Sequence, residues 1–178
     1  MSTLPAPPPE LIRQCTRFSS HQPHQALLGL RERLQASYGG ALQGILYYGS
    51  CLRGGDPFDG LVDLYVIVDD YRRAFHKRAA ALFNQLLPPN VFYLEVPLAE
   101  GTVRCKYAVL SLSHLEKCVS PRWFHSYFWA RFAQPMGLLH ARDNETAQRI
   151  HGLQAQAVLT FITRVLPRLP ETFTISDV

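Results

Sequence analysis

The sequence predicts an α+β fold, a mixed sheet with flanking helices, followed by a helical extension. Residues 61–68, LVDLYVIV, are β-branched and apolar on both faces, which is typical of a central buried strand. Residues 24–39 and 144–167 instead carry apolar residues at helical spacing. With 178 residues, of which 47% are hydrophobic, the chain is large enough to bury the core of one ordinary domain.

The composition bears on membrane insertion, on the charge of a partner and on the state of the cysteines. No apolar stretch of the sequence approaches the roughly 20 residues that a membrane-spanning helix needs. The formal net charge of +4 suits a partner that carries phosphates, although many basic surfaces have no such partner. The cysteines form no CxxC pair, which favours reduced structural thiols over a zinc site or a disulfide framework. They are Cys15, Cys51, Cys105 and Cys118.

The first ten residues, MSTLPAPPPE, lack both the apolar region of a signal peptide and the Arg-rich pattern of a transit peptide. We therefore expect residues 1–23 to be a disordered, proline-rich lead-in, and the chain to be cytosolic as made. Residues 24–120 are expected to form the core, and residues 121–178 the helical extension.

The core is expected to begin with a helix over residues 24–39 that a Gly-Gly pair ends. One stripe of this helix is apolar, formed by Leu27, Leu30 and Leu34. Residues 42–49, LQGILYYG, then predict a strand. The following loop is rich in glycine, aspartate and proline, which favour turns, and it leads into the buried strand.

The rest of the core is predicted to contain a helix, two strands and a short helix, over residues 69–87, 91–96, 102–111 and 111–119. Asp69 and Asp70 begin the longer helix, which a Pro-Pro pair ends. A turn that contains a glycine joins the two strands. Ser111 or Ser113 is the expected N-cap of the short helix.

From Pro121 the chain becomes aromatic-rich, and we expect it to be helical up to Pro135. Residues 144–167 predict a long amphipathic helix. The aromatic side chains of this region are explained either by helix packing or by contact with a lipid surface. They are Trp123, Phe124, Tyr127, Phe128 and Trp129.

Gly49, Ser50 and Asp63 form the pattern that points most directly to chemistry. An apolar strand ends in Gly-Ser, twelve residues follow, and the next apolar strand carries the carboxylate. This is the layout of a polymerase-β-like nucleotidyltransferase core. Glycine lets the backbone approach a triphosphate, and the next residues offer N–H groups and a hydroxyl to the phosphates. The carboxylate holds Mg²⁺ (or Mn²⁺), which clamps the attacking and leaving oxygens.

The second carboxylate of such a core is missing, because this chain has Tyr65 two residues after Asp63. Asp69 lies on the same predicted face, but it is about 20 Å along the strand, too far to share a metal. Other candidates for metal ligands are Asp56 and Asp59 in the loop and Glu95 in an apolar strand. Glu95 is favoured, since a third carboxylate of such a core would lie there.

Asp63 and Lys106 also have structural explanations. A carboxylate in an apolar strand needs a partner, because burying it unpaired is costly, so Asp63 either caps a turn or pairs with an arginine. Lys106 is explained as a strand residue whose stem packs on the sheet while its amine reaches solvent. These explanations stay open beside the functional ones.

Five blocks of the chain occur in the order YYGSCLRGG, LVDLYVIVDD, RCKYAVLSLSHL, YFWARFAQPM and, more weakly, RVLPRLPETFT. Together they resemble the mitochondrial-type phosphatidate cytidylyltransferases, the translocator assembly and maintenance protein and its bacterial relatives. The resemblance spans about residues 45–175, and that family also lacks a second acid at the position of Tyr65. Cys51 and Ala108 depart from its pattern, which has glycine at both positions. Family members continue into a further helical segment, so the extension is expected to be incomplete relative to them.

The resemblance implies transfer of a cytidylyl group from CTP to phosphatidic acid, which gives CDP-diacylglycerol and pyrophosphate for phospholipid synthesis. It implies that Gly49 and Ser50 cradle the β- and γ-phosphates and that Asp63 holds the Mg²⁺. Glu95 or Asp59 would complete the metal's ligands.

The same resemblance implies that Lys106 and Tyr107 bind the nucleotide, and that Lys106 also acts in catalysis by neutralising phosphate charge. Arg131 would bind the lipid phosphate through two parallel hydrogen bonds. CTP, phosphatidic acid and an anionic membrane surface are the expected partners, and no nucleic acid is expected.

Two other functions stay open. One is nucleotidyl transfer to another acceptor, such as an RNA end, a protein or a small alcohol, which would need a general base. The other is a catalytically degenerate module that binds nucleotide without turnover. The expected location is the bacterial cytoplasm, peripheral on the inner face of the cytoplasmic membrane, or alternatively the matrix side of the mitochondrial inner membrane.

Overall fold

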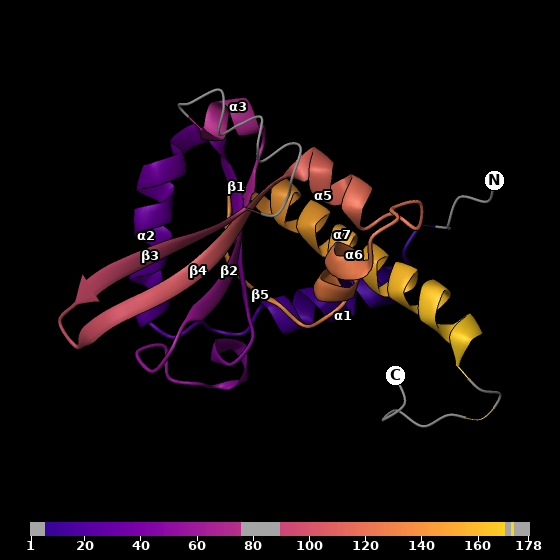
Figure 1. Ribbon diagram of the computed structural model, residues 1–178, viewed down its shortest axis with the longest axis horizontal. Coiled ribbons are helices and arrows are strands. Elements are labelled where there is room, and N and C mark those ends of the chain that lie inside the picture. The colour runs from indigo at the N-terminus through magenta and orange to yellow at the C-terminus, as the bar shows by residue number, and fades with distance from the viewer. Residues whose placement is uncertain (1–5, 76–89, 170–171, 173–178) are drawn as a thin grey trace.

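The structure is a computed structural model, and it describes residues 6–75, 90–169 and 172. These residues form a five-stranded mixed sheet with helices on both faces (Figure 1), which confirms the predicted α+β class. The strands are β1 (Leu42–Tyr48), β2 (Val62–Val68), β3 (Val91–Leu98), β4 (Gly101–Ser111) and β5 (Gly137–Ala141). The helices are α1 (Pro9–Ser19), α2 (Ala26–Tyr38), α3 (Tyr71–Ala74), α5 (Leu112–Cys118), α6 (Ser126–Phe132) and α7 (Asn144–Val165).

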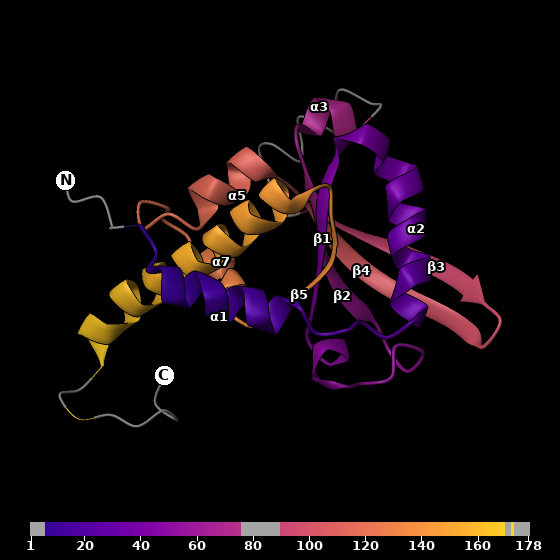
Figure 2. The same ribbon diagram turned by 180° about the vertical axis from the view of Figure 1, so that it is seen from behind.

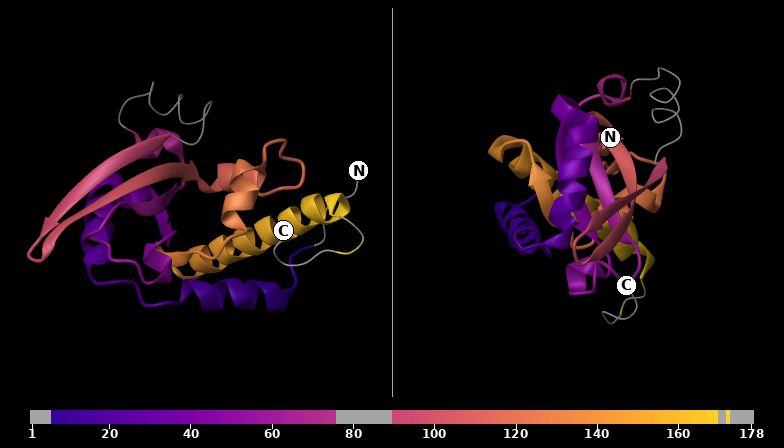
Figure 3. Two further views of the ribbon diagram at one scale, coloured as in Figure 1. Left: turned by 60° about the horizontal axis from the view of Figure 1, so that its bottom comes forward. Right: turned by 90° about the vertical axis from the view of Figure 1, so that its left-hand side faces the viewer.

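The strand order is β3-β4-β2-β1-β5, so β2 lies at the centre of the sheet. It pairs antiparallel with β1 and parallel with β4, and this register places Asp63 between Tyr48 and Lys106. The β3–β4 hairpin extends beyond the other strands (Figure 3). The strand that carries the candidate metal ligand is therefore flanked on both sides.

Each face of β2 packs on a different set of helices (Figures 1 and 2). The predicted leucine stripe of α2 is buried against one face, together with Leu64 and Val66. The other face packs Tyr65 and Ile67 against α5, α6 and α7. The prediction of a central strand that is apolar on both faces is confirmed.

The expected disordered lead-in is wrong for Pro9–Ser19, which form α1. Proline is tolerated in the first turn of a helix, where its missing N–H has no intrahelical partner to lose. The helix packs beside α7 (Figure 2), and the Ser19 hydroxyl donates to the Met136 carbonyl at 3.0 Å. Residues 1–5 of the expected lead-in lie outside the described residues.

The helical extension expected over residues 121–178 also contains a strand, because β5 pairs antiparallel with β1 and adds an edge strand to the sheet. A side chain at Gly137 would overlap the Tyr47 ring, so glycine is needed where the strand crosses this buried tyrosine. The segment is too short for its alternation to stand out among neighbouring helices. Residues 121–178 are thus partly built into the sheet.

The remaining elements follow the predicted order with small differences at their ends. Asp70 caps α3 as expected, but α3 ends at Ala74 and Phe75 is extended; residues 76–89 of the predicted helix lie outside the described residues. Ser111 is the N-cap of α5. All four cysteines are free thiols, as predicted. Among the described helices, none combines the length and the apolar character needed to cross a membrane.

Candidate functional site

The Gly49-Ser50 turn joins the end of β1 to the loop before β2. Gly49 has φ +78°, a backbone conformation that favours glycine. A Cβ at this position would lie 3.1 Å from Oδ2 of Asp63. The Ser50 carbonyl accepts hydrogen bonds from the N–H groups of Arg53 and Gly55, both at 2.9 Å, and so closes the turn. Glycine is needed here for a close approach to the Asp63 carboxylate.

Asp63 is paired across the sheet with Lys106. Lys106 Nζ lies 3.2 Å from Asp63 Oδ1, and the two side chains are 51% and 24% exposed. The partner that a carboxylate in an apolar strand requires is thus a lysine on β4 rather than an arginine or a turn. The amine of Lys106 lies against a carboxylate instead of reaching solvent alone.

Arg131 extends from α6 over the same part of the sheet. Its guanidinium carbon lies 5.3 Å from the centre of the Tyr48 ring and 5.9 Å from that of Tyr127, which are cation–π distances. Within the described ranges, Arg131 makes no ion pair with a carboxylate. Its positive charge is therefore held in place by two aromatic rings, and no acid of the described residues neutralises it.

A cavity of about 270 Å³ brings these side chains together. Its volume is just below the range of about 300–1,000 Å³ that is typical of small-molecule sites. Four residues predicted from the sequence line it: Asp63, Lys106, Tyr107 and Arg131. Gly49 and Ser50 are not among its lining residues, although their turn directly follows Tyr48, which lines it, and a Cβ at Gly49 would lie 3.1 Å from Asp63 Oδ2.

Tyr48 lines the cavity, although it was not predicted from the sequence as a site residue, and Tyr65 lies in the core beside it. Their rings stack with centres 5.3 Å apart, and Tyr65 also packs on Phe132 at 4.7 Å. Burial, assisted by the Asp63 carboxylate, raises the pKa of Tyr48 to about 12, so its hydroxyl stays protonated at neutral pH. Burial also raises the pKa of Tyr65, whose hydroxyl has no hydrogen-bond partner in the described part of the chain.

The burial of Tyr65 explains why a second acid is absent at this position. Its side chain is 0% exposed and belongs to the apolar core under α6 and α7. A carboxylate there would be buried among apolar groups, which is costly unless it is paired.

Glu95 is not brought to Asp63. It lies two strands away and two residues further along the sheet, about 10 Å across and 7 Å along. Its carboxylate is bound by Arg104 at 3.3 Å and accepts a hydrogen bond from the Tyr93 hydroxyl.

Asp56 and Asp59 are exposed in the loop before β2. Asp56 Oδ1 accepts from the Phe58 N–H at 2.9 Å, so it stabilises that loop. In the part of the chain that the structure describes, no group of three or more His, Cys, Asp or Glu side chains is placed to hold a metal. Among the residues that the structure describes, Asp63 is the one carboxylate that lines the cavity.

A single carboxylate fits one kind of metal binding. Mg²⁺ is often bound through one or two carboxylates together with substrate phosphates and water. Asp63 would suit a Mg²⁺ that arrives with a triphosphate, but it would not hold the ion by protein ligands alone.

Cys51 stands where the resembled family has glycine. Its thiol is partly buried, and burial is the main cause that raises its pKa, with the Asp63 carboxylate adding to it. The thiol is therefore protonated at neutral pH and is a poor nucleophile.

Comparison of the sequence with protein-family models and with curated proteins found no match to either.

Proposed function

We propose that this protein transfers a cytidylyl group from CTP to phosphatidic acid, forming CDP-diacylglycerol and pyrophosphate. One observation carries the proposal: a single cavity beside the Gly49-Ser50 turn collects Asp63, Lys106 and Arg131. A carboxylate for a metal and two cations for phosphates are the charges that this reaction needs. The five sequence blocks that resemble the cytidylyltransferase family support the same assignment.

In this proposal the turn binds the β- and γ-phosphates through its N–H groups and the Ser50 hydroxyl. Asp63 would hold Mg²⁺, or Mn²⁺, which when bound neutralises phosphate charge and orients the triphosphate. Lys106 is half-exposed, so its amine can turn from Asp63 towards a phosphate oxygen. Tyr107, which lines the same cavity, would contact the nucleotide.

Arg131 would bind the phosphate of the lipid. Two aromatic rings fix its guanidinium, and a fixed planar donor suits two parallel hydrogen bonds to one phosphate. The attacking oxygen of phosphatidic acid is anionic at neutral pH, so it needs positioning more than a general base. A lipid substrate would place the protein at an anionic membrane surface, on the inner face of the bacterial cytoplasmic membrane or the matrix side of the mitochondrial inner membrane.

A second candidate is a nucleotide-binding module without turnover. It is favoured by the presence of one carboxylate in the cavity and by its pairing with Lys106. Transfer to a hydroxyl acceptor is less favoured, because the general base it requires would have to be the same carboxylate.

The test is pyrophosphate release with each of the four nucleoside triphosphates and Mg²⁺, with and without phosphatidic acid micelles. The proposal predicts release with CTP and lipid together. Metal-dependent CTP binding without release would support the second candidate instead. Release with another nucleotide, or without lipid, would contradict the substrates proposed here.

A further inference from the structure

A second polar cavity lies at the C-terminal ends of the two parallel strands, β2 and β4. It has a volume of about 280 Å³ and is enclosed by α3, α5 and the loop before α6. Its lining is Asp70, Tyr71, Arg72, Ser111, Ser113, His114, Lys117 and Trp123. Ser111 is five residues beyond Lys106 on β4, so this cavity is about 17 Å along the strand from the Asp63 cavity. None of its lining residues takes part in the function proposed above.

We propose that this cavity binds a phosphate group, either free in solution or carried by the headgroup of a lipid. The charges of its lining favour an anion. Arg72 and Lys117 form no ion pair with a carboxylate among the residues that the structure describes. The one acid among the described residues of the lining, Asp70, accepts a hydrogen bond from the Arg72 N–H at 2.6 Å and caps α3.

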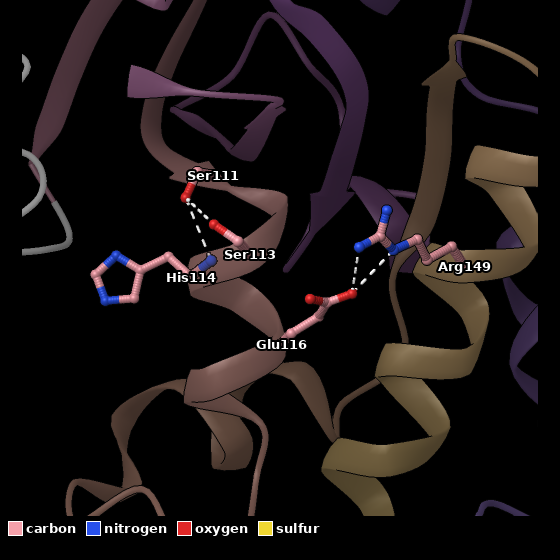
Figure 4. Close-up of polar contacts among 5 residues, drawn as sticks. All are labelled: Ser111, Ser113, His114, Glu116 and Arg149. Carbon is pink, nitrogen blue, oxygen red and sulfur yellow. Dashed lines mark hydrogen bonds and ion pairs between the residues drawn. The ribbon is translucent and has the colours of Figure 1, made fainter. Parts of the chain in front are cut away.

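The nearest acid on α5 is turned away from the cavity. Figure 4 shows Glu116 reaching towards α7, where Arg149 binds one carboxylate oxygen through two nitrogens, at 2.5 and 2.9 Å. The His114 ring extends to the other side of α5 in the same view. Glu116 is therefore occupied by Arg149, and Lys117 is left for a ligand.

Hydroxyl and ring donors add to the two cations. The Ser111 and Ser113 hydroxyls lie 3.3 Å apart, and Ser111 also accepts from the His114 N–H at 3.2 Å (Figure 4). Tyr71 Oη lies 3.0 Å from His114 Nδ1. With the tyrosine hydroxyl donating to Nδ1, the neutral imidazole carries its proton on Nε2 and offers it as a donor.

The ring of Trp123 lines the cavity and leads from it to the protein surface. The Nε1–H of its indole is buried and has no acceptor within the described ranges. Its ring packs on Phe124, with centres 5.5 Å apart, and Phe124 is 87% exposed. An exposed aromatic beside the cavity suits a lipid headgroup as well as a free phosphate.

The indole N–H signals provide a local test, because the chain has two tryptophans. Inorganic phosphate is titrated into ¹⁵N-labelled protein, with chloride at matched ionic strength as the reference. The Trp123 signal, identified by its loss in Trp123→Phe, is expected to shift with saturation. The signal of Trp129, in the core between α6 and α7, should stay in place.

The charge variant is Arg72→Gln with Lys117→Gln, two exposed side chains whose loss leaves the core intact. It is expected to weaken phosphate binding by about tenfold or more per cation, the worth of one charge-assisted hydrogen bond. The matched control is Arg17→Gln with Arg33→Gln, which removes equal charge from exposed positions outside both cavities and should bind as the wild type does.

Vesicles distinguish the two sources of phosphate. Binding to phosphatidylcholine vesicles is compared with binding to vesicles of phosphatidylcholine and phosphatidate in equal parts. A phosphatidate-dependent increase that the charge variant loses assigns the site to a lipid headgroup, and a response to inorganic phosphate alone assigns it to a free phosphate.

The proposal is overturned if neither probe gives a saturable response, or if the charge variant responds as the wild type does. Asp63→Asn should keep the full response at Trp123. This variant therefore separates failure of the second site from failure of the function proposed for the Asp63 cavity.

Discussion

Replacing Gly49 with alanine tests the contact between the turn and the Asp63 carboxylate. Both Gly49 and Gly54 have positive φ, at +78° and +85°. A Cβ at Gly49 would lie 3.1 Å from Asp63 Oδ2, whereas a Cβ at Gly54 would have no atom within 4 Å. Gly54→Ala therefore carries the same backbone strain without the contact, and it is the matched control.

The stability cost of the two variants should be similar. Alanine in the left-handed region costs roughly 1–2 kcal/mol, and the smaller entropy of the unfolded chain returns about 0.4–1 kcal/mol. The net loss of about 1 kcal/mol lowers the melting temperature by about 2–4 °C for a chain of this size.

Gly49→Ala and Gly54→Ala should differ in activity. In Gly49→Ala the Asp63 carboxylate must move by a few tenths of an ångström, which disturbs its distance to Lys106. Since a misplacement of about 1 Å can cost on the order of 100-fold in rate, we expect this smaller shift to lower kcat/KM for CTP by roughly four- to tenfold. Gly54→Ala should keep its activity. Equal activity of the two variants at equal stability would refute the reasoning.

Three further predictions concern other parts of the molecule. Arg131→Gln should raise KM for phosphatidic acid about tenfold, while KM for CTP changes little. The control is Arg122→Gln, which removes an exposed cation outside the cavity. A change in KM for CTP alone would contradict the assignment of Arg131 to the lipid phosphate. Gly137→Ala should lower the free energy of unfolding by about 1–3 kcal/mol, because the added methyl group meets the buried Tyr47 ring. The loss should appear as a lower midpoint of urea unfolding. An unchanged midpoint would show that the ring can move aside. Burial lowers the pKa of His151 below its ordinary value of 6.5. The contribution of neutral His151 to the free energy of unfolding is therefore complete above pH 6.5. It falls as the pH drops below 6.5, because the unfolded chain then takes up a proton more readily than the folded chain does. Unfolding titrations from about pH 7.5 to 5.5 should show a slope of up to about 1.4 kcal/mol per pH unit from this group, reduced in His151→Gln; an unchanged slope would assign it to other groups.

The fold could be predicted where a segment carries its own pattern. The apolar run of β2 and the leucine stripe of α2 determine which faces are buried, and the structure buries both. Helix α1 and strand β5 could not be found in this way. The proline-rich start hid the amphipathic character of Pro9–Ser19, and Gly137–Ala141 becomes a strand because β1 has a free edge beside it.

Some residues of the candidate site could likewise be predicted from the sequence, and others could not. Asp63 and Lys106 could be singled out because each is a charge inside an apolar strand, and the parallel register then makes them neighbours. Glu95 satisfied the same sequence criterion, yet the register pairs it with Arg104 instead. Tyr48 was missed because an aromatic residue at the end of a buried strand is expected from packing alone. Pairing between strands distant in sequence decides such cases, and local pattern does not encode it.

The most direct measurement is CDP-diacylglycerol formation from CTP and phosphatidic acid by the wild type, Asp63→Asn and Glu95→Gln. Each variant converts a carboxylate paired with a β4 cation into an amide on the same face of the sheet, and Asp63 alone lines the cavity. We predict that Asp63→Asn abolishes product formation while its urea midpoint shows a folded protein, and that Glu95→Gln retains it. Full activity of Asp63→Asn would contradict the assignment of this cavity as the site of nucleotidyl transfer.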